Sequence, residues 1–270
     1  MDALSQSAPS HDPAVPADLR RSRIARMIEE RDYVRVADLA THFHTSEVTI
    51  RSDLDVLATE GRLRRVRGGA MAANPAPERR FEEVRAEQAA EKGRIGAAAA
   101  RRVADGETVL LDVGTTTTEV ARALLARQEL QDVVVVTNSL TIAWELEAAI
   151  PRFTVVMTGG TLRPLQHSLV EPLGGAILEQ LHGHTLFLGC TGVDPDRGVT
   201  NVNLPEAAMK RRMVEAAGRT IVVADGSKIG RVTLARVCGI ESVDALITDQ
   251  AADPVVLAAL RERGVEVEIV

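Results

Sequence analysis

The stretch from Phe43 to Gly68, FHTSEVTIRSDLDVLATEGRLRRVRG, decides the fold of the first part of the chain. It contains, in order, a turn, a capped amphipathic helix, a glycine and an arginine-rich hairpin. Ser46 is a good N-cap because its hydroxyl can accept a hydrogen bond from a backbone N–H that lacks a helical partner. The aliphatic residues of one helical face follow at i, i+4 and i+7: Ile50, Leu54 and Leu57. Gly61 then ends the helix, since glycine tolerates left-handed dihedrals. This order predicts a winged helix-turn-helix.

Two further helices are predicted before this stretch. Leu19 to Arg31 carries apolar residues at helical spacing, and Val36 to Phe43 does the same ahead of a short turn. Between them, Tyr33 to Val36 is β-prone and suited to pair with the wing. We therefore expect a DNA-binding domain over residues 17–72. Residues 1–16 are rich in Ser, Ala, Pro and Asp and lack the pattern of a signal peptide, which predicts a disordered tail.

The polar faces of the recognition helix and the wing predict the contacts with double-stranded DNA. Hydroxyls and guanidinium groups at the start of a recognition helix reach base edges and phosphates, and wing arginines neutralise phosphates. An amphipathic helix alone is usually just a packed helix, and an arginine run is usually a solvated face, but their joint order favours DNA binding. The candidate DNA-binding residues are Ser46, Glu47, Thr49, Arg51, Ser52, Arg62, Arg64, Arg65 and Arg67.

Charge is unevenly distributed along the chain. The 270 residues carry a net charge of −6, but residues 17–80 hold 13 arginines against 10 acidic residues, and residues 81–270 hold 26 acidic against 19 basic residues. A basic head on an acidic body suits a protein whose larger domain stays away from the phosphates. Hydrophobic content of 45% allows a substantial core, which Ala, Val and Leu must fill because aromatic residues make up only 2%.

The second part of the chain alternates apolar strands with helical segments after a predicted linker at residues 73–80, with helix resuming from Glu82 to Ala104. Strands of this kind with helices between them indicate an α/β domain, here residues 81–270, around a mainly parallel sheet. The predicted strands are Thr108–Leu111, Val133–Thr137, Phe153–Thr158, Leu186–Leu188, Thr220–Ala224, Ala245–Thr248 and Val265–Val270.

Polar residues follow five of these strands. Parallel sheets bind ligands at the carboxyl ends of their strands. The glycine and threonines after the first strand precede a helix, which suits a phosphate, while Asp112 and Asn138 suit sugar hydroxyls and Lys228 supplies positive charge. Any single loop is more often an ordinary cap or turn, but five together predict a pocket for a phosphorylated polyol. The candidate effector-binding residues are Asp112, Gly114, Thr115, Thr116, Thr117, Asn138, Gly159, Gly160, Thr191 and Lys228.

Other classes of site and location have little support. The two cysteines, Cys190 and Cys238, are too few for a disulfide framework and indicate free thiols in a reducing cytoplasm. The paired histidines, His42 with His44 and His182 with His184, lack the further ligands that a metal site needs. No apolar stretch approaches the ~20 residues of a membrane-spanning helix. We expect no cofactor, no metal and no membrane partner.

The chain resembles the DeoR family of bacterial sugar-metabolism regulators from about Leu19 to Val270. The segments that carry the resemblance are Glu47–Leu54, Glu60–Gly61, Gly68–Ala70, Glu91–Lys92, Asp112–Thr117, Thr137–Ser139, Gly159–Gly160, Gly198–Thr200, Glu206, Asp225–Lys228 and Ile247–Asp249. The resemblance implies a transcription factor, most often a repressor, with a sensor domain similar to ribose-5-phosphate isomerase. It also implies a phosphorylated sugar as effector, a homo-oligomer (dimer or tetramer) on repeated operator half-sites, and a place in the cytoplasm on the nucleoid.

Two residues depart from the family pattern. Ser52 stands where the family often has an arginine, which bears on operator affinity, and Glu171 stands where glycine is common. The alternative to a sensor is an isomerase-like enzyme with a DNA-binding appendage. Aligning Ala224–Lys228 with the isomerase pattern puts Asn201 and Lys210 near the catalytic lysine and glutamate. The general base is then missing, although Glu206 lies close in sequence.

Overall fold

The computed structural model describes residues 16–31, 33–66, 68–73 and 78–270, and the chain divides into two compact units between Ala76 and Pro77. The predicted tail (except Pro16), part of the predicted linker and the candidate Arg67 lie outside the described residues.

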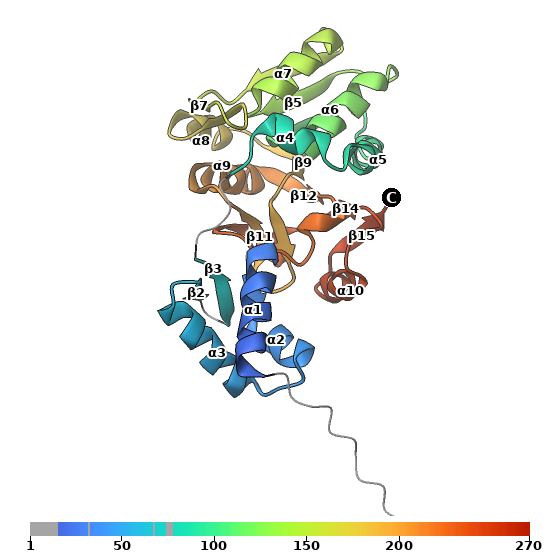
Figure 1. The fold of residues 1–270 in the computed structure, drawn as a ribbon. Coiled ribbons are helices and arrows are strands. Elements are labelled where there is room, and N and C mark those ends of the chain that lie inside the picture. Colours follow the sequence, from blue (N-terminus) through green and yellow to red (C-terminus); the bar gives the residue numbers. More distant parts are fainter. Residues whose placement is uncertain (1–15, 32, 67, 74–77) are drawn as a thin grey trace, which may run out of the picture. The chain divides into compact units, whose positions relative to one another are not determined.

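The first unit is a helical head with a small antiparallel sheet (Figure 1). Its elements are α1 (Ala17–Arg31), β1 (Tyr33–Arg35), α2 (Val36–His42), α3 (Glu47–Thr59), β2 (Leu63–Val66) and β3 (Gly69–Ala72). The strand order is β1-β3-β2, so the strand that precedes α2 pairs with the wing, as the sequence predicted. At Gly69 a Cβ would lie 2.3 Å from the carbonyl oxygen of Val34, so only glycine allows these two strands to approach so closely.

The packing of the head fixes the orientation of α3. One core joins the three helices through Ile24, Ile28, Leu39, Ile50, Leu54 and Leu57, each at most 1% exposed. Arg20 Nε lies 2.6 Å from Asp53 Oδ2, with side chains 11% and 7% exposed, and this buried ion pair ties α1 to α3. The Ser46 hydroxyl accepts a hydrogen bond from the Thr49 backbone N–H at 3.1 Å, as expected for the N-cap. The predicted winged helix-turn-helix is confirmed.

The second unit is built on a seven-stranded sheet whose neighbouring strands all run parallel, among the described residues. Its strands are β4 (Thr108–Leu111), β5 (Val133–Thr137), β6 (Phe153–Met157), β9 (Gly183–Leu188), β12 (Ala217–Val223), β14 (Ala245–Thr248) and β15 (Glu266–Ile269). The order across the sheet is β15-β14-β12-β9-β4-β5-β6. All seven predicted strands are present, with ends that differ by a few residues, and the α/β fold class is confirmed.

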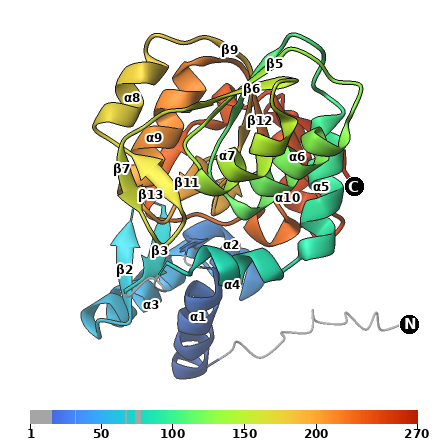
Figure 2. The same ribbon diagram turned by 90° about the horizontal axis from the view of Figure 1, so that it is seen from above.

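Helices cover both faces of this sheet. They are α4 (Phe81–Ala86), α5 (Ala89–Ala100), α6 (Thr115–Ala126), α7 (Leu140–Leu146), α8 (Leu173–Leu178), α9 (Leu204–Glu215) and α10 (Pro254–Glu262), with short 3₁₀ turns at Glu147–Ala149, Gly226–Lys228 and Ile240–Ser242. One core packs α5, α6 and α7 on the first face, and a second core packs α8, α9 and α10 on the other. Figure 2 shows α5 and α6 on the opposite side of the strands from α8 and α9.

Two small antiparallel sheets were not predicted from the sequence. β7 (Thr161–Arg163) pairs with β8 (Ser168–Val170), and β10 (Gly192–Asp194), β11 (Gly198–Asn201) and β13 (Ala235–Cys238) form a three-stranded sheet. These strands are too short to show a clear alternation of apolar and polar residues. The β7–β8 hairpin, residues 161–170, places side chains beside the carboxyl ends of the main sheet.

The prediction of one continuous helix from Glu82 to Ala104 is wrong. It is divided into α4 and α5, and Gln88 between them has a left-handed φ of 46°. The ammonium group of Lys92 donates to the carbonyl oxygens of Val84 at 2.6 Å and Glu87 at 2.7 Å. The Val84 carbonyl also accepts from the Glu87 N–H at 3.2 Å, so Lys92 adds a second bond to it and supplies a donor for the Glu87 carbonyl, which stabilises the break. Within the ranges described, no helix has the length and apolar character needed to span a membrane.

Candidate functional site

The exposed face of α3 is the first candidate site. Ser46, Glu47, Arg51 and Ser52 are exposed, while Thr49 is half-buried at the start of the helix. Its hydroxyl lies 2.9 Å from that of Ser46, and Arg51 Nη2 lies 2.5 Å from Glu47 Oε2. The predicted helix residues therefore gather at the start of α3, where hydroxyls and an arginine are already ordered by neighbours.

The wing supplies a second row of cations. Arg62 and Arg64 are exposed, and Arg65 is half-buried with its Nε 3.2 Å from Asp55 Oδ1 of α3. Because Asp55 already neutralises Arg65, Arg62 and Arg64 are better placed to meet phosphates.

One residue of this surface was missed by sequence reasoning. Val48 is 72% exposed in the first turn of α3, where an aliphatic side chain gains nothing from the core. A valine methyl can contact the methyl group of thymine in the major groove. The sequence contained a signal for this residue, because Val48 is an apolar residue that lies outside the buried i, i+4, i+7 face of this helix.

Thr49→Ala is expected to change the sequence preference for DNA by about tenfold at one base position, because we expect the first turn of α3, which carries this hydroxyl, to enter the major groove. Selection from a randomised operator library measures this. Thr59→Ala is the matched control, since Thr59 loses an equivalent hydroxyl, bonded 2.9 Å to the Asp55 carbonyl, at the other end of the same helix. An unchanged preference in Thr49→Ala would contradict the proposed orientation of α3.

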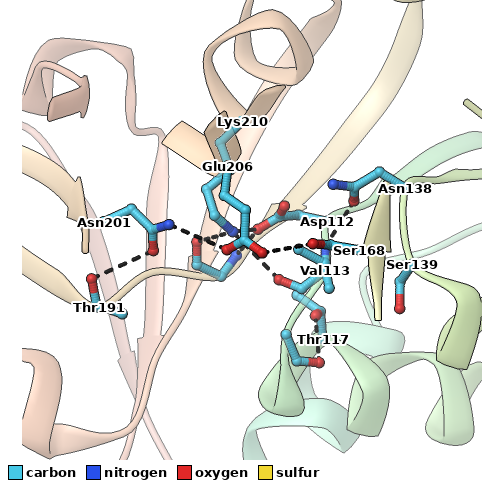
Figure 3. A network of polar contacts seen from close by, with 12 residues as sticks. Asp112, Val113, Thr117, Asn138, Ser139, Ser168, Thr191, Asn201, Glu206 and Lys210 are labelled. Atoms are coloured by element: carbon cyan, nitrogen blue, oxygen red, sulfur yellow. Dashed lines mark hydrogen bonds and ion pairs between the residues drawn. The ribbon is translucent and has the colours of Figure 1, made fainter. Parts of the chain in front are cut away.

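The second candidate site is a buried cluster at the carboxyl ends of β4, β5 and β9 (Figure 3). We call it the strand-end cluster: Asp112, Asn138, Ser168, Glu206 and Lys210. Asp112 follows β4 and is fully buried, and its carboxylate forms an ion pair with Lys210 of α9. The Gly189 backbone N–H donates to Asp112 Oδ2 at 3.0 Å.

The second carboxylate oxygen of Asp112 is the distinctive feature of this cluster. Asp112 Oδ1 is buried and has no hydrogen-bond partner among the described residues. A buried polar atom without a partner costs free energy, so such an atom in a native site calls for an explanation. Burial raises the pKa of the Asp112 carboxyl to about 6, with Lys210 opposing the rise only in part. A ligand hydroxyl donating to Oδ1 would satisfy this atom.

The Thr-rich loop lies beside Asp112 at the start of α6. Thr115, Thr116 and Thr117 occupy its first turn and are mostly buried, and the Thr117 hydroxyl donates to the Gly114 carbonyl at 3.0 Å. The first N–H groups of a helix lack partners within it and favour an anion. The predicted phosphate subsite and the predicted hydroxyl partner Asp112 are thus brought together.

The remaining candidates are placed differently. Asn138 is fully buried, and its carboxamide bonds the protein's own backbone, accepting from Val113 N at 2.9 Å and donating to Leu169 O at 3.4 Å. Gly160 has a φ of 116°, and a Cβ there would lie 2.2 Å from the Val170 carbonyl oxygen, so the backbone itself requires glycine. Gly159 is exposed.

Two further candidates, Thr191 and Lys228, lie next to β11 and after β12, respectively. The Thr191 hydroxyl bonds the Thr200 carbonyl at 3.2 Å and the Thr233 hydroxyl at 2.9 Å. Lys228 is half-buried in the 3₁₀ turn after β12. Cys190 follows Gly189, and burial raises the pKa of its thiol to about 12, which keeps it protonated.

Four residues that the candidate set omitted contribute to or contact this site. Lys210 and Glu206 lie one helical turn apart on α9, and both are at most 5% exposed. Glu206 Oε1 accepts from the Ser168 hydroxyl at 2.7 Å and pairs with Arg163. The spacing of Glu206 and Lys210 at i, i+4, with Asn203 as N-cap, was a readable signal of two charges on one helical face.

Comparisons with known proteins find matches for both units of the chain. Residues 20–76 match a model described as a DeoR-like helix-turn-helix domain, and residues 87–250 match a DeoR C terminal sensor domain. The chain is 36% identical over 254 residues to a putative aga operon transcriptional repressor of Escherichia coli O157:H7, covering 93% of each chain. It is 30% identical over 250 residues to the glycerol-3-phosphate regulon repressor of Escherichia coli K12, covering 93% of this chain and 98% of that one.

A ribose 5-phosphate isomerase from Methanocaldococcus jannaschii aligns with a TM-score of 0.38 and 18% identity over 51% of this chain and 52% of its own. The two relatives described above are named as repressors, and the family models describe a helix-turn-helix domain and a sensor domain. The chain is therefore grouped with transcriptional regulators, and the enzyme alternative has no support from these relatives.

Proposed function

We propose, on the premise that the chain belongs to the DeoR family of transcriptional regulators, that it represses genes of carbohydrate metabolism and releases their operators when a phosphorylated sugar binds the strand-end cluster. The observation that carries the effector part is the buried Oδ1 of Asp112, which lies beside the first turn of α6 and has no hydrogen-bond partner in the described part of the chain. A hydroxyl donor and an anion on one small molecule satisfy both features.

The chemistry of binding follows from these groups. The phosphate accepts hydrogen bonds from the N–H groups of Thr115 to Thr117 and from the hydroxyls of Thr115 and Thr116, because the Thr117 hydroxyl already donates to the Gly114 carbonyl. A sugar hydroxyl donates to Asp112 Oδ1, and Lys228 adds positive charge near the phosphate. Gly114, Gly159 and Gly160 shape the loops, while Asn138 and Thr191 support them through their own hydrogen bonds.

The domain roles and the assembly are parts of the same proposal. Residues 17–72 bind DNA, residues 73–80 link the two domains, and residues 81–270 bind the effector. A homodimer or tetramer places two heads on two operator half-sites, and binding of both heads raises affinity by orders of magnitude over one. Effector binding removes that bivalent contact, and the protein acts in the cytoplasm, on the nucleoid.

A panel of phosphorylated sugars tests the function with the full chain. Ribose 5-phosphate, glucosamine 6-phosphate and glycerol 3-phosphate are compared with their unphosphorylated parents by thermal shift and by operator binding. We expect one phosphorylated member to raise the melting temperature through mass action and to weaken operator binding by at least roughly tenfold. Asp112→Asn should lose the response to that member. A panel that changes neither the melting temperature nor the operator affinity would contradict the effector proposal.

A further inference from the structure

Arg163 of β7 contacts two carboxylates that are far apart in sequence. On one side it pairs with Glu206 of the strand-end cluster. On the other, its Nη2 lies 2.6 Å and its Nη1 3.4 Å from the two carboxylate oxygens of Glu78. The side chains of Arg163, Glu78 and Glu206 are 18%, 17% and 6% exposed, so solvent screens these pairs weakly. One guanidinium therefore joins the cluster to the first described residue of the second unit.

The segment that begins at Glu78 is attached to the β7–β8 hairpin at further points. We call residues 78–86 the entry segment, since they comprise the end of the predicted linker and α4, which follows it. The Phe81 N–H donates to the Leu165 carbonyl at 3.0 Å, and Gln166 Nε2 donates to the Arg79 carbonyl at 2.6 Å. Displacement of the hairpin would therefore displace the entry segment.

The same hairpin is attached to the strand-end cluster at its other strand. The Ser168 hydroxyl donates to Glu206 Oε1 at 2.7 Å, and the Leu169 N–H donates to the Asn138 carbonyl at 2.8 Å. Glu206 thus receives hydrogen bonds from both strands of the hairpin, from Arg163 and from Ser168. Any ligand group that binds Glu206 competes with Arg163 for its carboxylate.

We propose that Arg163, which bonds both carboxylates, transmits occupancy of the strand-end cluster to the entry segment by shifting its bonding from Glu206 toward Glu78. The identity of the ligand rests on the proposed function, but the exchange itself does not. When a hydroxyl of the ligand donates to Glu206, the attraction between Glu206 and Arg163 weakens, and Arg163 binds Glu78 more tightly. The entry segment, which includes the end of the linker to the head, is then held more firmly against the hairpin.

Amide hydrogen exchange of the entry segment, measured in the full chain without any ligand, tests this coupling. Glu78→Gln and Arg163→Gln each remove the anchor and should speed exchange of the Phe81 amide by about threefold to tenfold. Glu206→Gln removes the competing carboxylate and mimics an occupied cluster, so it should slow the same exchange by about twofold to fivefold. In the Arg163→Gln background, Glu206→Gln should have no further effect.

Glu83→Gln is the matched control, because it removes one carboxylate from the same segment. The carboxylate of Glu83 pairs with Arg79 at 3.8 Å and not with Arg163. Equal exchange in Glu78→Gln and Glu83→Gln would overturn the proposal, and this comparison leaves the cluster intact. An equal effect of Glu206→Gln with and without Arg163 would also overturn it. Because these exchange measurements use no ligand, neither of these results would contradict the effector proposal. Conversely, if no sugar phosphate in the panel has an effect, the coupling between Arg163 and the entry segment is not contradicted.

Discussion

Replacing Lys210 with methionine is expected to lower the free energy of unfolding of the second unit by about 3–5 kcal/mol, because it leaves the carboxylate of Asp112 buried without its cation. Asp112 is fully buried and Lys210 is 2% exposed, so water cannot replace the lost partner. Methionine keeps the length of the side chain, which limits the contribution of a cavity. Urea denaturation followed by circular dichroism measures the effect.

The double variant Lys210→Met/Asp112→Asn separates charge from packing. Removing both charges should restore most of the stability, since a neutral pair of similar volume costs far less than one isolated charge. Lys228→Met is the surface-side control and should change stability by less than about 1 kcal/mol, because Lys228 is only half-buried. If the double variant is as unstable as Lys210→Met, the loss comes from packing and not from the buried carboxylate.

Arg62→Ala/Arg64→Ala is expected to weaken binding to all DNA sequences by about ten- to a hundredfold at moderate salt, because both exposed guanidinium groups of the wing would meet phosphates. The slope of log affinity against log salt should fall by about one for each arginine removed from each head. Fluorescence anisotropy with an operator and with unrelated duplex DNA, at several salt concentrations, measures both effects.

Arg101→Ala provides the control for overall charge. Its side chain is 66% exposed on the second unit, so the substitution removes a surface cation without touching the wing. Operator affinity and salt slope should stay unchanged in this variant. A loss in Arg62→Ala/Arg64→Ala confined to the operator, with unrelated DNA bound as before, would mean that these arginines read bases and not phosphates.

Much of the architecture could be predicted because it depends on local patterns. The N-cap Ser46 and the buried face of α3 are readable within one helix, and apolar strands followed by polar loops are readable strand by strand. The parallel sheet then brings Asp112 and the Thr-rich loop to one edge. Periodicity and turn chemistry therefore predicted the head, the sheet and two of the five residues of the strand-end cluster, Asp112 and Asn138.

The rest of the site depends on contacts that leave no local signal. Asp112 and Lys210 lie 98 residues apart, and Glu78 and Arg163 lie 85 residues apart. A charged residue in a three-residue strand such as β7 looks like any solvated side chain until the fold brings its partner close. The break at Gln88 was missed for a similar reason, because no glycine or proline marks it and the contacts of Lys92 with the Val84 and Glu87 carbonyls appear only in the fold.

The strand order of the sheet determines when each unit can form during synthesis. The head completes its three helices and its wing within the first 72 residues. In contrast, β4 lies between β5 and β9, and β9 in turn needs β12, which ends at Val223. Parallel pairing of strands that are distant in sequence is slow, because the chain must lose the entropy of closing a long loop before the stabilising contacts between the strands form. The nascent chain therefore presents a folded DNA-binding head well before its sensor domain can close, so newly made protein passes through a stage in which the head exists without control by any metabolite.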